Sequence, residues 1–237
     1  NKAAGELKDR LAARLGPDAN DIWASTFHSA CVRILRRDID RLGFDKDFTI
    51  YDTDDSKRVI KDVLKEKHLD EKTYPPRSVL AAISHSKDQY ESIEDFAKRA
   101  EAANDWRMKD YARIYAAYEK RLRTANALDF DDIIFHTVTL LQQEPEVLDY
   151  YQRKFRYVLV DEYQDTNHLQ YLLTSLLAGG YQNLCVVGDD DQSIYRFRGA
   201  NIENILNFEE QYPKARTIRL EQNYRSTQNI LDAANAV

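Results

Sequence analysis

The stretch YVLVDEYQDTN, residues 157–167, decides the fold class. Its apolar run from Val158 to Val160 is short and rich in β-branched residues, which is typical of a strand in a parallel sheet with both faces covered. Asp161 and Glu162 follow directly, at the carboxyl end of this strand. Because ligands of parallel α/β sheets bind beyond the carboxyl ends of the strands, we expect the two carboxylates at a binding edge.

Two functions explain the acidic residues at this position. An adjacent pair fits the chemistry of a magnesium nucleotide, in which Asp161 holds the hydrated metal and Glu162 orients and deprotonates the attacking water. Alternatively, Asp161 and Asp165 cap the helix that follows and interact with its positive end. The VLVDE pattern alone does not choose between the two.

A second strand with a polar loop is predicted by the run NLCVV, residues 183–187, which leads into GDDDQSIYRFRGAN. Gln192 in this loop is an uncharged donor suited to sensing a terminal phosphate. Around Tyr195, Phe197 and Arg198, aromatic rings alternate with guanidinium groups. This pattern is typical of single-strand binding, because bases stack on rings and arginines bind phosphates. The alternative is a buried aromatic pair flanked by surface arginines.

A third such loop, LEQNYRST, follows the strand-like run TIRL at residues 217–220. In this loop Arg225 is placed to reach a γ-phosphate across a cleft, and Tyr224 is placed to stack on a purine. Asn-Tyr-Arg-Ser is also a common start of a helix, with Ser226 as its cap.

The organisation of the chain is read from its periodicity. Residues from about 50 to 124 are charged, helix-rich and free of glycine, with Pro75-Pro76 as a break. This change in composition predicts a helical subdomain inserted between two parts of an α/β domain. Elsewhere, apolar spacing predicts helices at 2–15, 27–42, 168–178 and 201–211, and a short strand at 21–26.

Composition sets limits on the class of protein. The 237 residues are 43% hydrophobic and 31% charged, as in an ordinary globular protein, and they contain no apolar run long enough for a membrane helix. Cys31 and Cys185 make no disulfide framework, so we expect both to be small core residues in a reducing compartment. The net charge of −6 argues against non-specific polyanion binding, although it allows a local phosphate-tracking groove.

Six segments occur in a fixed order along the whole chain: NKAAGEL, STFHSACVRILRRDIDR, LDFDDII, LVDEYQDTN, VVGDDDQSIYRFRGANI and LEQNYRST. Together they resemble superfamily 1 DNA helicases of the UvrD/Rep type. The resemblance implies an α/β fold, a partial RecA-like P-loop NTPase sheet flanked by helices. Residues 1–49 and 125–237 would form part of the first motor domain, and residues 50–124 the inserted helical subdomain.

The resemblance also implies roles at the nucleotide site. Asp161 matches the residue that binds Mg²⁺, and Glu162 matches the base that activates water. Gln192 matches the residue that couples the γ-phosphate to the DNA site. Arg225 matches an arginine that contacts this phosphate, and Tyr224 matches the ring that packs on adenine.

For DNA, the resemblance implies that Thr26 and His28, in STFHS, face the DNA backbone. Tyr195 and Arg198 match residues that line the single-strand channel. Phe197 stands where the family usually has tryptophan, so we expect base stacking to be kept but weakened. Without the motif, His28 would more often be a partly buried structural histidine.

The activity implied is that of an ATP-dependent 3′-to-5′ DNA helicase of repair or replication. It would be a cytoplasmic enzyme using ATP and Mg²⁺ on single-stranded DNA and on single-strand/duplex junctions, with no membrane partner. The family's phosphate loop, Gly-x-x-x-x-Gly-Lys-Ser/Thr, does not occur in this chain. We therefore expect that loop upstream, a second motor domain downstream, and no ATPase activity from the chain alone. Two alternatives stay open: a single-strand-binding module with vestigial NTPase motifs, and the helicase part of a helicase-nuclease.

Overall fold

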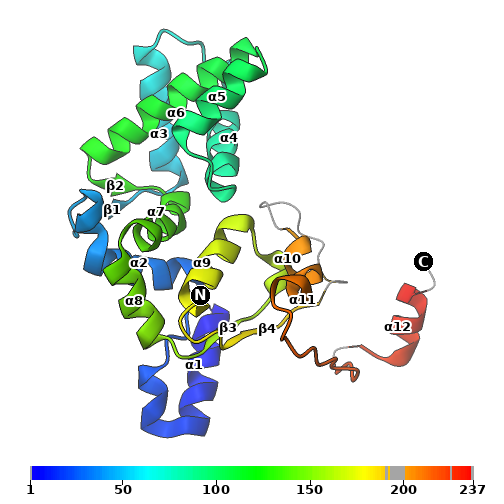
Figure 1. Cartoon of the computed structure of the whole chain (residues 1–237). Coiled ribbons are helices and arrows are strands. Elements are labelled where there is room, and N and C mark those ends of the chain that lie inside the picture. The colour runs from blue at the N-terminus through cyan, green and yellow to red at the C-terminus, as the bar shows by residue number, and fades with distance from the viewer. Residues whose placement is uncertain (1, 190–191, 193–200, 225, 236–237) are drawn as a thin grey trace. The chain divides into compact units, whose positions relative to one another are not determined.

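The computed structural model describes residues 2–189, 192, 201–224 and 226–235. The chain divides into two compact units, Asn1–Ile205 and Leu206–Val237. Helices dominate both units, and the described strands are short and form two parallel pairs (Figure 1). Within the described ranges, no helix is both long and apolar enough to span a bilayer.

Helices of the first unit begin where the sequence supplies caps. Thr26 caps α2, Asp52 and Asp129 form capping boxes at α3 and α7, and Asn167 forms one at α9. The helices of this unit are α1 (Lys2–Leu15), α2 (Phe27–Asp38), α3 (Thr53–Glu66), α4 (Pro76–Asp88), α5 (Ile93–Ala102), α6 (Trp106–Thr124), α7 (Phe130–Gln143), α8 (Pro145–Lys154) and α9 (His168–Ala178); 3₁₀ turns lie at Gly16–Asp21, Ile39–Leu42 and Tyr163–Asp165. The short helix α10 (Glu203–Leu206) spans the sequence boundary between the units. The second unit contains α11 (Phe208–Gln211) and α12 (Gln228–Asn235).

Both strand pairs are parallel, as predicted for this class of fold. β1 (Thr49–Ile50) pairs with β2 (Ala127–Leu128), and β3 (Val158–Val160) pairs with β4 (Leu184–Val186). In the second pair Val160 lies opposite Val186, so the two strands end at the same level. This register brings together the loops that follow β3 and β4.

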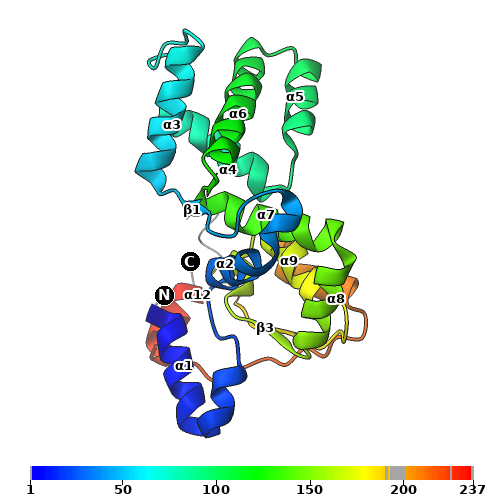
Figure 2. The same ribbon diagram turned by 90° about the vertical axis from the view of Figure 1, so that its left-hand side faces the viewer.

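Two hydrophobic clusters fill the first unit. One lies mainly on α2, α7, α8 and α9, and the other on α3 to α6. Figures 1 and 2 show α3 to α6 as one group of helices, joined to the rest through α7 and the β1–β2 pair. The clusters support our proposal that residues 50–124 form an inserted helical subdomain.

A buried ionic cluster joins the two groups of helices. The ammonium of Lys87, on α4, lies 2.8 Å from Asp129 Oδ2, 2.6 Å from Asp132 Oδ1 and 2.8 Å from Glu119 Oε1. Burial lowers the pKa of Lys87, but the three carboxylates outweigh it and hold this pKa well above its ordinary value. Burial and the neighbouring carboxylates raise the pKa of Asp132. We call Lys87, Glu119, Asp129 and Asp132 the Lys87 cluster.

His136, one turn beyond Asp132, gives a pH-dependent stability. Burial, helped by the charge of Lys87, lowers the pKa of His136 to about 3 from an ordinary 6.5. Between these values the unfolded chain binds a proton that the folded chain does not, so stability falls as pH falls below 6.5. From pH 6.5 to pH 5 the loss attributable to His136 is about 2 kcal/mol.

We therefore expect the variant His136→Gln to have a flatter stability curve than the wild type between pH 6.5 and pH 5. Urea unfolding at several pH values measures both curves, and titration of Asp132 is present in both and largely cancels in the difference. Parallel curves for the two proteins would contradict a neutral, buried His136.

Some sequence predictions are wrong in the structure. Residues 21–26 form no strand: the 3₁₀ turn Gly16–Asp21 runs into extended backbone that ends at the Thr26 cap. Residues 217–220 also form no strand, and Ile218 and Leu220 are solvent-exposed. A strand needs a neighbouring backbone for its hydrogen bonds, and no described segment pairs with this run. The predicted helix at 201–211 is split into α10 and α11.

The prediction of a sheet covered on both faces is also wrong here. Leu159, in the middle of β3, is 73% exposed, and Cys185 on β4 is exposed instead of lying in the core. Both residues belong to a two-stranded pair, which has fewer packing partners than a full sheet. Cys31 does lie in the core, where burial raises the pKa of its thiol to about 12.

Candidate functional site

The loops after β3 and β4 start side by side. The amide of Val187 donates to the carbonyl of Val160 at 2.8 Å, and the amide of Tyr163 donates to the carbonyl of Val187 at 2.9 Å. These bonds continue the β3–β4 pairing past the strand ends and fix Asp161 and Glu162 next to the Gly188 loop. We call the edge formed by residues 161–165, residues 187–189 and Gln192 the carboxyl rim.

Asp161 and Glu162 are both exposed on this rim. Glu162 has a left-handed backbone, with φ of 52°, which is uncommon for a residue other than glycine and costs about 1 kcal/mol or more. The amide of Glu162 donates to Asp161 Oδ1 at 3.0 Å. The turn therefore presents two neighbouring carboxylates to solvent at the end of a parallel strand.

The alternative role of these acidic residues, capping the next helix, is wrong. Asn167 caps α9: its side chain accepts from the amide of Gln170 at 2.9 Å, and Gln170 Oε1 accepts from the amide of Asn167 at 3.1 Å. The capping position of α9 is thus occupied by Asn167, and not by Asp161 or Asp165. The acidic residues are left for another purpose.

The two loops of the rim are connected by hydrogen bonds through Gln164, which is 1% exposed. Gln164 Nε2 donates to Glu162 Oε2 at 2.8 Å, and Gln164 Oε1 accepts from the amide of Asp189 at 3.1 Å. Asp189 Oδ2 accepts from Gln192 Nε2 at 2.6 Å. The structure thus brings Glu162 and Gln192, two of the predicted site residues, into one network.

Sequence reasoning missed Gln164 and Asp189. Both lie inside segments that had been selected for their carboxylates and for Gln192. No spacing rule shows that Gln164 turns inward, because this depends on the left-handed backbone at Glu162. The sequence does show an amide side chain, Gln164, between acidic residues at the end of a strand. Only the tertiary structure shows that this side chain links the two loops.

The donor set at the rim fits a hard divalent cation. Magnesium prefers carboxylate oxygen and water ligands, and Asp161 and Glu162 offer exposed carboxylates at a strand end. A second group, Glu119, Asp132 and His136, has its ligand atoms within 4.8 Å of one another. There the ammonium of Lys87, 2.6 Å from Asp132, already supplies the positive charge, so we assign no metal to it.

The predicted DNA-facing residues lie at the start of α2. Thr26 caps this helix, accepting from the amide of Ser29 at 3.3 Å. His28 stacks on Phe130, with ring centroids 3.7 Å apart and an interplanar angle of 19°. Phe130 begins α7 and is 54% exposed, which is unusual for so large an apolar ring. The LDFDDII segment had been noticed in the sequence, but no role had been given to Phe130.

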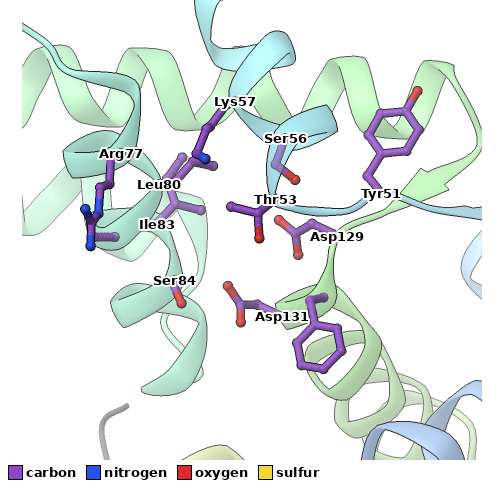
Figure 3. Close-up of a pocket in the computed structure, with 12 residues that line it drawn as sticks. Tyr51, Thr53, Ser56, Lys57, Arg77, Leu80, Ile83, Ser84, Asp129 and Asp131 are labelled. Carbon is purple, nitrogen blue, oxygen red and sulfur yellow. The ribbon is translucent and has the colours of Figure 1, made fainter. Parts of the chain in front are cut away.

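A cavity of about 270 Å³ lies beside Phe130, between α3, α4 and the start of α7 (Figure 3). Its wall combines basic, acidic and apolar side chains, and Asp129 of the Lys87 cluster contributes to it. The residues that line it include Tyr51, Thr53, Lys57, Arg77, Leu80 and Asp131. Phe130 itself lines the cavity.

Five predicted site residues remain. Tyr224 lies in the second unit, where its ring is exposed. The four others, Tyr195, Phe197, Arg198 and Arg225, lie outside the described residues. Their roles stay predictions.

The structure thus combines a parallel strand pair that ends in an acidic rim with a separate group of helices, α3 to α6. Residues 1–213 match the UvrD/REP helicase N-terminal domain. The chain belongs to this family.

Among the curated relatives are three proteins named ATP-dependent DNA helicase PcrA. The chain is 57% identical to the one from Bacillus subtilis (strain 168), 56% to one from Staphylococcus epidermidis and 54% to one from Staphylococcus aureus. Each match covers 100% of this chain and 32% of the relative. The chain thus spans about a third of the length of these proteins.

Proposed function

We propose that this chain forms part of an ATP-dependent DNA helicase that moves 3′-to-5′ along single-stranded DNA and opens duplexes at junctions. The observation that carries the proposal is the carboxyl rim, where Glu162 and Gln192 are linked through Gln164 and Asp189. Family membership supports the same reaction, and the relatives' names state ATP dependence and DNA helicase activity.

At the rim, Asp161 would hold Mg²⁺ and Glu162 would orient and deprotonate the attacking water. The metal, when bound, neutralises charge on the phosphates. Gln192 would contact the terminal phosphate, and in the same proposal Arg225 contacts that phosphate and Tyr224 packs on adenine. The amide-to-carboxylate bond from Gln192 to Asp189 keeps the sensor attached to the rim.

On the DNA side, Thr26, His28 and Phe130 would face the strand, together with Tyr195, Phe197 and Arg198 from the loop after β4. The exposed ring of Phe130 supports this, because a base gains about 1–3 kcal/mol by stacking on an aromatic side chain. A DNA substrate in repair or replication and two free cysteines are consistent with a cytoplasmic enzyme.

The test uses the protein extended to the length of its relatives. ATP hydrolysis is measured with and without single-stranded DNA, and unwinding is measured on a duplex with a 3′ tail. We expect hydrolysis stimulated by DNA, and unwinding that requires the 3′ tail. Single-strand binding without hydrolysis would favour the module with vestigial motifs, and DNA cleavage would favour the helicase-nuclease.

Replacing Phe130 by alanine should weaken single-strand binding by about 5- to 150-fold, the equivalent of 1–3 kcal/mol. Fluorescence anisotropy of a labelled oligonucleotide at two salt concentrations measures this. Trp106→Ala is the matched control, because Trp106 is another exposed ring, at the start of α6. Equal affinities of the two variants would refute the role of Phe130, whereas the salt dependence should stay unchanged in both.

A further inference from the structure

Gln164 is a buried polar residue that links the two loops of the carboxyl rim. It is 1% exposed, yet both ends of its amide are used within the rim. Nε2 donates to the carboxylate of Glu162 at 2.8 Å, and Oε1 accepts from the backbone amide of Asp189 at 3.1 Å. A buried polar side chain with both ends satisfied is costly to replace, because each lost partner leaves a group unpaired.

The orientation of this amide is determined by its partners. A carboxylate can only accept, so the NH₂ group of Gln164 must face Glu162. A backbone amide can only donate, so the carbonyl oxygen must face Asp189. Reversing the amide would break both bonds. The side chain of Gln164 can therefore link the Glu162 carboxylate to the Asp189 backbone amide in only one orientation.

The end of β4 is packed directly against this link. A Cβ atom at Gly188 would lie 2.6 Å from Gln164 Oε1 and 2.7 Å from Ile205 Cδ1. A side chain there would have to displace the ends of Gln164 and Ile205, so glycine allows the close approach of this loop to Gln164. The position of the Gly188 loop and the position of Gln164 thus depend on each other.

We propose that Gln164 is a positioning residue for ATP hydrolysis, and this proposal rests on the proposed function. By donating to Glu162 Oε2 it fixes the carboxylate in one rotamer and orients Oε1 of Glu162 to receive the proton of the attacking water. Elsewhere in the described part of the chain, no hydrogen bond restrains this carboxylate, which the exposed, left-handed turn alone would leave mobile.

The same link connects Glu162 to the predicted phosphate sensor. Gln164 holds the amide of Asp189, and the Asp189 carboxylate accepts from Gln192 at 2.6 Å. A shift of Gln192 on contact with phosphate would move Asp189, and Gln164 would pass that movement to Glu162. Hydrolysis then depends on both loops being in place.

The test compares Gln164→Leu and Gln164→Glu in the protein extended to the length of its relatives. Leucine removes both hydrogen bonds. Glutamate keeps the acceptor for the Asp189 amide but replaces the donor by a carboxylate that repels Glu162. Gln152→Leu is the control, since Gln152 donates to the Leu176 carbonyl away from the rim.

We expect both Gln164 variants to lower kcat about 10- to 100-fold, because a hydrogen bond to a charged group is lost. KM for ATP and the affinity for single-stranded DNA should change by less than about threefold, since neither ligand touches Gln164. The control should keep the kcat of the wild type.

A kcat of Gln164→Glu restored to near the wild-type value would show a packing role alone and would overturn the proposal. A rise in KM with unchanged kcat would also overturn it. If the wild type and Gln152→Leu both fail to hydrolyse ATP, the proposed function falls and the positioning role falls with it.

Discussion

Replacing Lys87 by methionine is expected to lower the free energy of unfolding by roughly 3–5 kcal/mol. Lys87 is 1% exposed and contacts the carboxylates of Glu119, Asp129 and Asp132 within 2.8 Å. Methionine keeps most of the side-chain length but removes the only charge that compensates these acids within the cluster. The carboxylates must then take up protons or draw in water.

The loss of stability should be concentrated where the two groups of helices meet. Tyr118 donates to Asp129 Oδ2 at 2.9 Å, and Asp129 and Asp132 together cap the start of α7. Removing Lys87 therefore weakens the α4–α7 and α6–α7 connections at once. Hydrogen exchange should show faster opening at the beginning of α7, next to Phe130.

Lys98→Met is the control for this prediction. Lys98 pairs with Asp95 at 3.1 Å on the surface of α5, and exposed pairs contribute about 1 kcal/mol or less. Chemical denaturation of both variants of the 237-residue chain measures their free energies of unfolding. If Lys87→Met were no less stable than Lys98→Met, the Lys87 cluster would not hold the helical subdomain to α7.

Glu162→Gln is expected to lower the kcat for ATP hydrolysis by roughly 10²- to 10⁴-fold in the protein extended to the length of its relatives. Glutamine keeps the size of the side chain and can still bond Gln164, but it cannot accept the proton of the attacking water. Binding of ATP should persist, because the substitution leaves Asp161 in place. A single-turnover measurement separates binding from chemistry.

Glu146→Gln is the matched control, because its carboxylate is exposed on α8 and pairs with Arg41 at 3.3 Å. It should hydrolyse ATP at the rate of the wild type. Activity of Glu162→Gln within about threefold of this control would show that another group activates the water, and Glu162 would lose its assigned role.

Apolar spacing and capping residues predicted those helices whose ends are marked in the sequence. Residues 168–178 form α9 as predicted, because Asn167 and Gln170 build a capping box and Leu169 and Leu173 give one buried face. The helix at 2–15 was also predicted correctly, although its apolar face is not covered and Leu7 is 49% exposed. Periodicity predicts a helix, but not whether a partner covers it.

Features that depend on distant partners were not predicted. The run at 217–220 has the composition of a strand, yet it pairs with no described strand. No sequence pattern marks Lys87 as the partner of Glu119 and Asp129, because these contacts arise only from the packing of α4, α6 and α7. Likewise the inward turn of Gln164 follows the left-handed backbone at Glu162, two residues earlier.

The central claim is that the carboxyl rim binds the magnesium nucleotide. It is tested most directly by a structure of the protein, extended to the length of its relatives, with Mg²⁺ and a non-hydrolysable ATP analogue. In that structure we expect a carboxylate oxygen of Asp161 at about 2.1 Å from Mg²⁺, or bridged to it by one water, with Glu162 facing the terminal phosphate. A triphosphate bound at another edge, with neither carboxylate within reach of the metal or its waters, would contradict it.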